Sequence, residues 1–337
     1  MVVMQILLLL AAGSPASSSG ALLDRRRESA NAARIRINDW VRTSPAPQFG
    51  LPPSKFADRL RILVDTPQSL RQGEYPWCLP AAFLNPVLRR FPDRAVSFAL
   101  DLYSTGLAKF GDLAVQTGSE LRTFDYPAEV ERKYQEKLEE GQALPDILRR
   151  NRDLFLSAHA DWLLLAGIEQ LTRPSQAVMG PISEAKENGH LERITGIGDL
   201  GNDLVNLFRQ CGLYESATKL SDSEKQDKQR LVAALSKARD EEDVCLITGL
   251  QRFIGAGGGG HAVRLAEPPI IRANTTNSGT PAKDEDVGFK FWSWGFKPTS
   301  IDYNKVTFDD RENAFTFALT REEFSRILIV RAKPKIV

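Results

Sequence analysis

One cysteine of the chain opens an apolar segment whose composition is typical of a helix. Cys78 is followed by Leu79, Pro80 and the apolar residues 81–84. A proline is tolerated in a first turn because the N–H that it lacks would have no intrahelical acceptor. A thiol at a helix N-terminus lies at the positive end of the helix dipole, which favours the nucleophilic thiolate. Gln72, six residues earlier, could donate its side-chain amide to an oxyanion beside the thiol. The spacing favours covalent acyl transfer at Cys78, and the alternative is a small buried cysteine on an apolar helix.

A histidine in the last third of the chain is the second group that could do chemistry. The glycine-rich run 255–260 leads into His261, and an aromatic stretch at 289–295 ends in Ser293-Trp294-Gly295. An imidazole could take the proton of a thiol as a general base. The glycine run suits a loop that lets a backbone approach a substrate, and a plain flexible linker explains it equally well.

The order of these motifs, a glutamine before a cysteine, then Gly-His-Ala-Val, then an aromatic strand ending in Ser-Trp-Gly, resembles that of the papain-like cysteine peptidases. The glycine-rich approach to the histidine is similar to that of the calpains. The resemblance implies that Cys78 is the nucleophile and His261 the general base. It likewise implies that Gln72 is the oxyanion-hole glutamine and Trp294 the tryptophan that shields the histidine's partner. The fold that it implies has a helical lobe carrying the thiol and an antiparallel sheet lobe carrying the base.

One position departs from the family pattern. The asparagine that orients the histidine should lie two residues before the tryptophan of the Trp-Gly pair, and Trp292 stands there instead. Either another polar group orients His261, or the cysteine and histidine act as a dyad, or the site is inactive. The nearest polar candidates in the sequence are Asp284, Asp286 and Asn304.

The composition is that of an ordinary globular protein and excludes several classes. Of the 337 residues 26% are charged and 42% hydrophobic, and the net charge of +1 gives no global attraction for nucleic acid. Three cysteines are too few for a disulfide scaffold, and the three histidines and three cysteines show no zinc spacing. We expect no metal and no cofactor, and a protein or peptide as the substrate.

The first residues of the chain form a short apolar leader. Residues 1–21 begin with an apolar run that is too short to cross a bilayer, and they end in small residues. This pattern fits a secretory signal that lacks the usual basic residues, and the alternative is a loosely docked N-terminus. A secreted location is therefore favoured over a cytoplasmic one, and no stable membrane span is expected.

Helical periodicity dominates the first two thirds of the chain, and strand patterns dominate the last third. The segment 145–171 is the most apolar helix, and His159 within it is expected to be a packed or capping group. Pro86 should end or kink the helix that Cys78 begins. Other helices are predicted at 33–41, 56–64, 96–103, 128–141 and 221–239, and strands at 244–248, 261–265, 270–271, 287–294, 315–319 and 327–330.

A glycine motif at 196–201 matches the G-x-G-x-x-G of dinucleotide-binding loops. Such a loop needs a strand before it and a βαβ unit around it, and no strand is predicted before Ser221. A glycine-flanked start of a helix is the favoured interpretation.

The sequence thus predicts an α+β protein with a leader at 1–21, a helical lobe at 22–220 that carries Cys78, and a β-rich lobe at 221–337 that carries His261. The predicted function is thiol-dependent acyl transfer by a papain-like cysteine peptidase, or by a deamidase or transamidase relative. The resemblance also allows a secreted toxin or effector. The alternatives are a catalytically inactive papain-like interaction protein and an unrelated helical binding scaffold.

Overall fold

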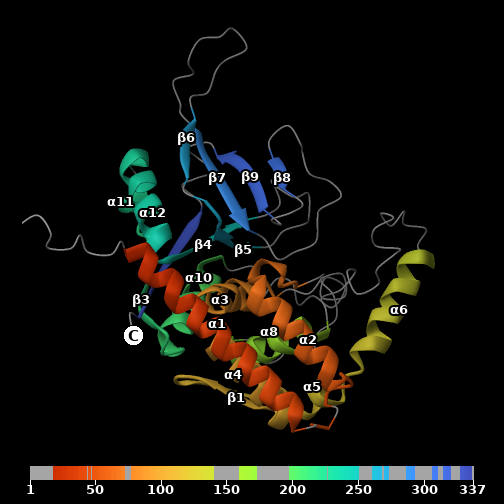
Figure 1. Ribbon diagram of the computed structural model, residues 1–337. Helices are drawn as coiled ribbons and strands as arrows, with labels where there is room; N and C mark the ends of the chain where they lie inside the picture. Colours follow the sequence, from red (N-terminus) through yellow and green to blue (C-terminus); the bar gives the residue numbers. More distant parts are fainter. Residues whose placement is uncertain are drawn as a thin grey trace, which may run out of the picture.

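The structure, a computed structural model, combines a helical part with one large antiparallel sheet (Figure 1). This arrangement confirms the predicted α+β class. The described residues are 18–43, 45–46, 48–72, 77–139, 159–172, 197–225, 227–249, 260–267, 269–272, 286–292, 306–309, 314–319 and 327–335.

Helices occupy most of the first part of the chain. Prolines begin α2, η1 and α4, because the fixed φ of proline suits a first turn. The helices are α1 (Ser18–Arg42), α2 (Pro53–Asp65), the 3-10 helix η1 (Pro67–Ser69), α3 (Cys78–Arg90), α4 (Pro92–Thr105), α5 (Ser119–Thr123), α6 (Tyr126–Glu139), α8 (His159–Thr172), α10 (Ile197–Gln210), α11 (Asp222–Lys225) and α12 (Lys228–Glu241).

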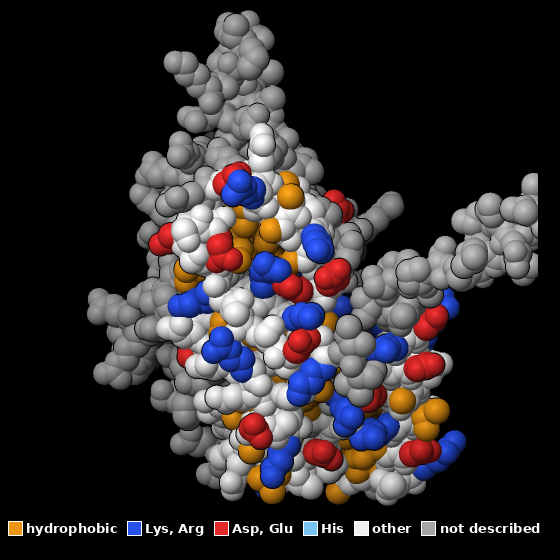
Figure 2. All heavy atoms as spheres, turned by 90° about the vertical axis from the view of Figure 1, so that its left-hand side faces the viewer, with side chains coloured by type: hydrophobic (Ala, Val, Ile, Leu, Met, Phe, Trp, Pro, Cys, Tyr) orange, Lys and Arg blue, Asp and Glu red, His pale blue; other side chains and the backbone are white. Residues whose placement is uncertain are grey.

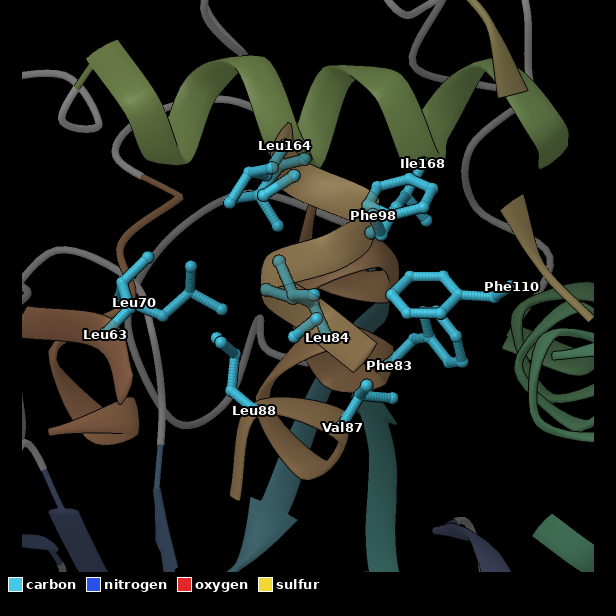
Figure 3. Packing of buried hydrophobic residues seen from close by; sticks show 14 of the residues in the cluster. Leu63, Leu70, Phe83, Leu84, Val87, Leu88, Phe98, Phe110, Leu164 and Ile168 are labelled. Carbon is cyan, nitrogen blue, oxygen red and sulfur yellow. The ribbon is translucent and has the colours of Figure 1, made fainter. Parts of the chain in front are cut away.

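Helix α3 is the centre of the hydrophobic core. Every residue from Cys78 to Leu88 is buried, and the helix packs against α4, α8, α10 and the sheet strand β5 (Gly260–Leu265). A helix that is apolar on all sides belongs inside a protein, so its position follows from its composition. Figure 3 shows Phe83, Leu84, Val87 and Leu88 of α3 between Leu63 and Leu70 on one side and Phe98 and Phe110 on the other, beneath Leu164 and Ile168 of α8.

Pro86 does not end α3, contrary to the expectation from the sequence, and the helix continues to Arg90. A proline here removes one intrahelical bond, because it has no N–H to donate to the carbonyl of Ala82, four residues earlier. The thiol of Cys245 lies 3.6 Å from that carbonyl oxygen and donates to it. A side chain of the sheet thus replaces the missing backbone donor.

The C-terminal end of α3 is fixed by a buried ionic cluster. Arg90 donates through Nε to Oδ2 of Asp243 (2.7 Å) and through Nη2 to the carbonyl oxygen of Glu242 (2.8 Å). The hydroxyl of Tyr214 donates to the same oxygen of Asp243 (3.0 Å). Burial, followed by the charge of Asp243, raises the pKa of Tyr214 well above its usual value. These contacts attach the last turn of α3 to the start of a central strand.

The large sheet has eight strands, and all of its pairings are antiparallel. The strand order is β3-β10-β4-β5-β7-β9-β8, and β6 pairs with β7 beside this path. The strands are β3 (Tyr214–Lys219), β4 (Asp243–Gly249), β5 (Gly260–Leu265), β6 (Ile270–Arg272), β7 (Asp286–Trp292), β8 (Val306–Asp309), β9 (Ala314–Leu319) and β10 (Leu328–Pro334).

The two faces of the sheet belong to different hydrophobic cores. In β4, Cys245 and Ile247 join the core around α3, whereas Val244 and Leu246 join a second core that includes residues of α12. Side chains of a strand alternate between the faces with a period of two. The alternation therefore assigns one face of the sheet to α3 and α10 and the other to α12.

A separate antiparallel hairpin is formed by β1 (Leu107–Phe110) and β2 (Leu113–Gln116), where the sequence predicted no strand. Its turn packs on the end of α10, where the N–H of Asp112 donates to the carbonyl of Gln210 (2.9 Å). Gly111 has a φ of 53°, and a Cβ there would lie 2.7 Å from the Cys211 carbonyl group. A glycine is required because both its conformation and its surroundings exclude a side chain.

Strand β3 corrects the expectation that no strand precedes Ser221. It follows α10, which begins at Ile197 inside the glycine motif, as the favoured interpretation of that motif predicts. β3 pairs antiparallel with β10, so α10 and β3 do not form a βαβ unit. The strand also lies before residue 221, where the β-rich lobe was expected to begin.

The described N-terminal helix begins inside the predicted leader. α1 starts at Ser18, so it includes the last residues of the segment 1–21, and the earlier ones lie outside the described residues. Within the described part of the chain, none of the helices has the length and apolar character needed to cross a membrane.

The face shown in Figure 2 carries basic and acidic side chains in alternation, without a field of one sign. Pairs on α1 are typical of this mixture, since Arg34 pairs with Asp65 (2.5 Å) and Arg42 with Asp39 (2.9 Å). A face of this kind lacks the basic patch by which proteins bind nucleic acid.

Candidate functional site

Cys78 is the first residue of α3, which confirms its predicted place in the helix. Trp77 is the N-cap residue, and the first intrahelical bond runs from the N–H of Ala81 to the carbonyl of Trp77. The first N–H groups of a helix have no intrahelical acceptor, and Pro80 has no N–H at all. Cys78 is 7% exposed. The thiol therefore lies at the positive end of a helix that is otherwise buried almost throughout.

The stretch that leads to the thiol, residues 71–78, is called the thiol segment below. Both of its ends are held by the first turn of α8. The backbone N–H of Arg71 donates to Oδ2 of Asp161 (2.9 Å), and Trp77 lies against Trp162 with 6.5 Å between ring centroids. Gln72, next to the first anchor, is buried. Consecutive residues of one helix thus position the glutamine and the thiol relative to each other.

Asp161 is a fully buried carboxylate in the most apolar helix of the chain. Arg59 of α2 donates to it twice, through Nε to Oδ1 (2.7 Å) and through Nη2 to Oδ2 (2.6 Å). Burial opposes the charge of Arg59, but the pair with Asp161 outweighs it, so the pKa of Arg59 is raised. A buried charge persists in this way only when it is both paired and hydrogen-bonded.

The turn η1, just before the thiol segment, is tied to α3 and to the sheet. Asn85 of α3 donates through Nδ2 to the carbonyl oxygen of Pro67 (2.9 Å). Trp292 of β7 donates through Nε1 to the carbonyl oxygen of Gln68 (2.9 Å). These two bonds fix the backbone that enters the thiol segment.

A buried arginine, Arg264, contacts both side chains that hold η1, Asn85 and Trp292. Arg264 of β5 donates through Nε to Oδ1 of Asn85 (2.9 Å), and its guanidinium carbon lies 5.7 Å from the ring centre of Trp292. Trp292 is the residue at the position where the resemblance to papain-like peptidases leads one to expect an asparagine. Here its indole binds the turn η1 and lies beside Arg264, in keeping with the preference of guanidinium groups for tryptophan faces.

The ladder of β4 and β5 decides on which face His261 lies. Ala262 belongs to the core around α3, and Arg264 bonds to α3 directly. Val263 and Leu265 belong to the core under α12. The ladder is regular from one end of β5 to Arg264, so strict alternation gives His261 the face of Val263 and Leu265.

The N-terminal end of α3 and the start of β5 lie toward the same end of β4, although α3 and His261 lie on different faces of the sheet. Arg90, at the C-terminal end of α3, bonds to Asp243 at the start of β4, and Ala82 lies beside Cys245 further along the strand. α3 therefore runs antiparallel to β4, and its thiol end is directed toward the start of β5, where His261 lies. The pairing of the thiol with this imidazole stays a prediction.

Burial shifts the pKa of several groups near the site. It lowers the pKa of His261 to about 4, which keeps the imidazole neutral at pH 7. It raises the pKa of the Cys211 thiol to about 11 and also raises that of Cys245. Both of these thiols donate to backbone carbonyl groups, Cys211 to that of Phe208 (3.2 Å).

His159 is a packed group, as the sequence predicts. It is the first residue of α8, its Nε2 lies 3.0 Å from the carbonyl oxygen of Phe49, and its ring stacks on Tyr126 with 4.5 Å between centroids. Burial lowers the pKa of His159 to about 4.

Several candidates from the sequence lie outside the described residues: Trp294, Asp284 and Asn304. Asp286 is the first residue of β7, at the far end of the strand from Trp292. The structure therefore leaves open which polar group would orient His261.

Sequence reasoning missed Asp161, Arg59 and Asn85, which hold the thiol segment and η1. Asp161 had a usable signal, because a carboxylate inside so apolar a helix must have a buried partner. Asn85 gave the same signal as an amide within the apolar run of α3. Nothing in the sequence indicates which partner each would find.

Within the described ranges, histidine, cysteine and acidic side chains do not gather in any group that could hold a metal ion. Searches of family models, of curated proteins and of solved structures found no match for this chain.

Proposed function

We propose that the chain is a thiol-dependent acyl-transfer enzyme with the two-lobed papain-like fold and with Cys78 as its nucleophile. The observation that carries this proposal is the position of Cys78 as the first residue of the buried helix α3, with the buried Gln72 anchored just before it. The order of the elements supports it, since helices around the thiol precede the antiparallel sheet that holds the candidate base. The substrate is a peptide or protein amide, and the reaction is peptide hydrolysis, deamidation or transamidation.

In this mechanism the Cys78 thiolate attacks the amide carbonyl, and the C=O electron pair moves onto oxygen. The oxyanion accepts hydrogen bonds from the backbone N–H of Cys78 and from the amide of Gln72. Loss of one such donor typically costs about 10²–10³-fold in rate. His261 accepts the thiol proton and returns it to the leaving amine, and water or another amine then releases the acyl group.

The proposal requires the His261 imidazole to reach the α3 face of the sheet. A β-bulge at the start of β5 would re-aim this side chain without moving Arg264, and bulges of this kind are common next to active sites. Gly260, the residue before His261, makes such a change in backbone conformation inexpensive. The regular ladder would then be the resting arrangement of the strand.

The second candidate is an interaction protein on the same fold without catalysis. The ladder that gives His261 the α12 face favours this function. So does the bond of Trp292 to η1, because Trp292 stands where a catalytic asparagine would be.

The rate at which iodoacetamide alkylates Cys78 separates the two candidates. If His261 acts on the thiol, His261→Ala should slow the alkylation of Cys78 at least about tenfold, since one unit of thiol pKa changes the thiolate fraction tenfold. His159→Ala, which removes a half-buried imidazole in α8 whose pKa burial lowers in the same way, should leave this rate unchanged. Gln72→Ala should also leave it unchanged, because an oxyanion donor acts on the transition state.

An unaltered alkylation rate in folded His261→Ala protein would show that the two groups do not meet and would favour the interaction protein. Circular dichroism of each variant establishes that the comparison is made on folded chains.

A further inference from the structure

The anchor of the thiol segment contains two guanidinium groups and one carboxylate. Both oxygens of Asp161 are used by Arg59, at 2.7 and 2.6 Å. The backbone N–H of Arg71 also donates to Asp161, at 2.9 Å. The carboxylate thus accepts three hydrogen bonds, two from the side chain of Arg59 and one from a backbone N–H, and none from the side chain of Arg71 among the described contacts.

The guanidinium group of Arg71 is partly buried and finds no acceptor in the described part of the chain. Burial, followed by the charge of Arg59, lowers its pKa, and Asp161 offsets this only in part. Among the residues that the structure describes, no hydrogen bond or ion pair is formed by the Arg71 side chain. A cation withdrawn from water without a partner costs free energy, so such a group needs an explanation.

The backbone of Arg71 is anchored at the start of the thiol segment. Its backbone and Trp77 dock on consecutive residues of α8, so the segment from Arg71 to Cys78 begins and ends at the same turn of that helix. Arg71 is also the direct neighbour of the buried Gln72. The unpaired cation is therefore at the entrance of the thiol segment.

We infer that Arg71 binds a carboxylate group of a peptide substrate, either an acidic side chain or the C-terminal carboxylate, beside the thiol segment. A guanidinium group presents a planar pair of N–H donors that matches a carboxylate. The excess of one positive charge at Arg59, Asp161 and Arg71 is balanced by a monoanion, whereas a phosphate dianion would leave a negative charge in a partly buried place. The placement beside a reacting amide rests on the proposed function, but the binding of a carboxylate does not.

Thermal unfolding of the full chain in propionate, at constant ionic strength, tests the carboxylate site. Propionate should raise the Tm of the wild type by about 2 °C near saturation, and it should not raise that of Arg71→Gln. Arg230→Gln is the matched control, because Arg230 is an exposed arginine of α12 and its loss should leave the propionate shift intact. Without propionate, Arg71→Gln should unfold at the same temperature as the wild type or above it, since its backbone N–H still binds Asp161.

Two acetylated tripeptides distinguish the sources of the carboxylate. One carries a glutamate between alanines and ends in an amide, and the other carries glutamine there and ends in a free carboxylate. The peptide whose Tm shift disappears in Arg71→Gln shows whether Arg71 binds a side-chain carboxylate or a C-terminal one. Equal shifts in the wild type and in Arg71→Gln would overturn the inference, and so would a larger shift with inorganic phosphate than with propionate.

These outcomes are independent of the proposed function. Cys78→Ser should keep the propionate shift in full. A shift that depends on Arg71, together with a Cys78 that His261 does not activate, would leave the carboxylate site standing and refute the catalytic proposal. A Cys78 that His261 activates, without a propionate shift that depends on Arg71, would support the catalytic proposal and refute the carboxylate site.

Discussion

At the scale of single residues, the thiols differ in their access to solvent and in what burial does to them. Cys211 and Cys245 are 1% and 0% exposed, and burial raises the pKa of both. Cys78 is 7% exposed at a helix N-terminus, the position that stabilises a thiolate.

Iodoacetamide should therefore modify Cys78 before Cys211 and Cys245 at pH 7.5. Peptide mass spectrometry after timed alkylation measures the three rates separately. We expect Cys78 to react at least about a hundredfold faster, since a two-unit rise in thiol pKa lowers the thiolate fraction by that factor. Protection of Cys78 alone, or a common rate for all three, would contradict this reading of the helix N-terminus.

The residues that could be predicted were those whose chemistry depends on local sequence. Cys78 at the start of a helix and His159 as a packed group are both confirmed, because a cap and an apolar stripe are set by neighbours in the chain. The partners of Trp292 and Asn85 could not be predicted. Both bind the carbonyl groups of η1, and such contacts depend on how the sheet docks on α3.

At the scale of elements, α3 was predicted to begin at Cys78 but not to pass through Pro86. Propensity argues against proline in a helix, since it costs about 3 kcal/mol relative to alanine. Burial of α3 and the donor from Cys245 override that cost here. The strand β3 was missed because its partner β10 lies more than a hundred residues later. The strands β1 and β2 pair with each other, and each pattern of four residues is too short to be distinctive.

A double-mutant cycle tests the link between the proline and the thiol. Cys245→Ala should destabilise the wild type more than it destabilises Pro86→Ala, because an alanine at 86 restores the N–H that binds the Ala82 carbonyl. We expect a coupling of about 0.5 kcal/mol in the free energy of unfolding, measured in urea.

Cys211→Ala is the matched control for this cycle, because that thiol donates to the carbonyl of Phe208 in the last turn of α10 and its loss should be additive with Pro86→Ala. A coupling for Cys245 no larger than that for Cys211 would show that the thiol does not replace the backbone donor.

At the scale of the whole molecule, two buried histidines in different layers link stability to pH. Burial lowers the pKa of His159 and of His261 to about 4, below the 6.5 of an exposed histidine. The unfolded chain therefore binds more protons between these values. The stability that the neutral rings contribute is present above pH 6.5 and is lost as the pH falls toward 4.

The free energy of unfolding in urea should thus fall between pH 7.5 and pH 5 by on the order of 2 kcal/mol for each histidine. His159→Gln and His261→Gln should each remove part of this slope, and the double substitution should remove most of it. An unchanged slope in the double variant would assign the pH dependence to carboxyl groups instead.

Periodicity in the sequence predicted the fold class and the order of helices before the sheet. It did not predict the residue at which the helical part ends and the sheet begins. β3 precedes the expected start of the β-rich lobe at 221 and forms one edge of its sheet. A short edge strand that alternates weakly resembles a loop until its neighbour β10, more than a hundred residues later, is known.

The long-range hydrogen bonds around η1 and the thiol segment have a consequence for folding during synthesis on the ribosome. The bond from Trp292 to Gln68 spans 224 residues, and that from Arg59 to Asp161 spans 102. Domains fold from the N-terminal side as they are synthesised, and contacts of long sequence separation form last. A nascent chain that has completed the described helices, the last of which ends at Glu241, still lacks the strand that fixes the turn before Cys78. The turn before the candidate nucleophile is therefore fixed only after β7 has been made.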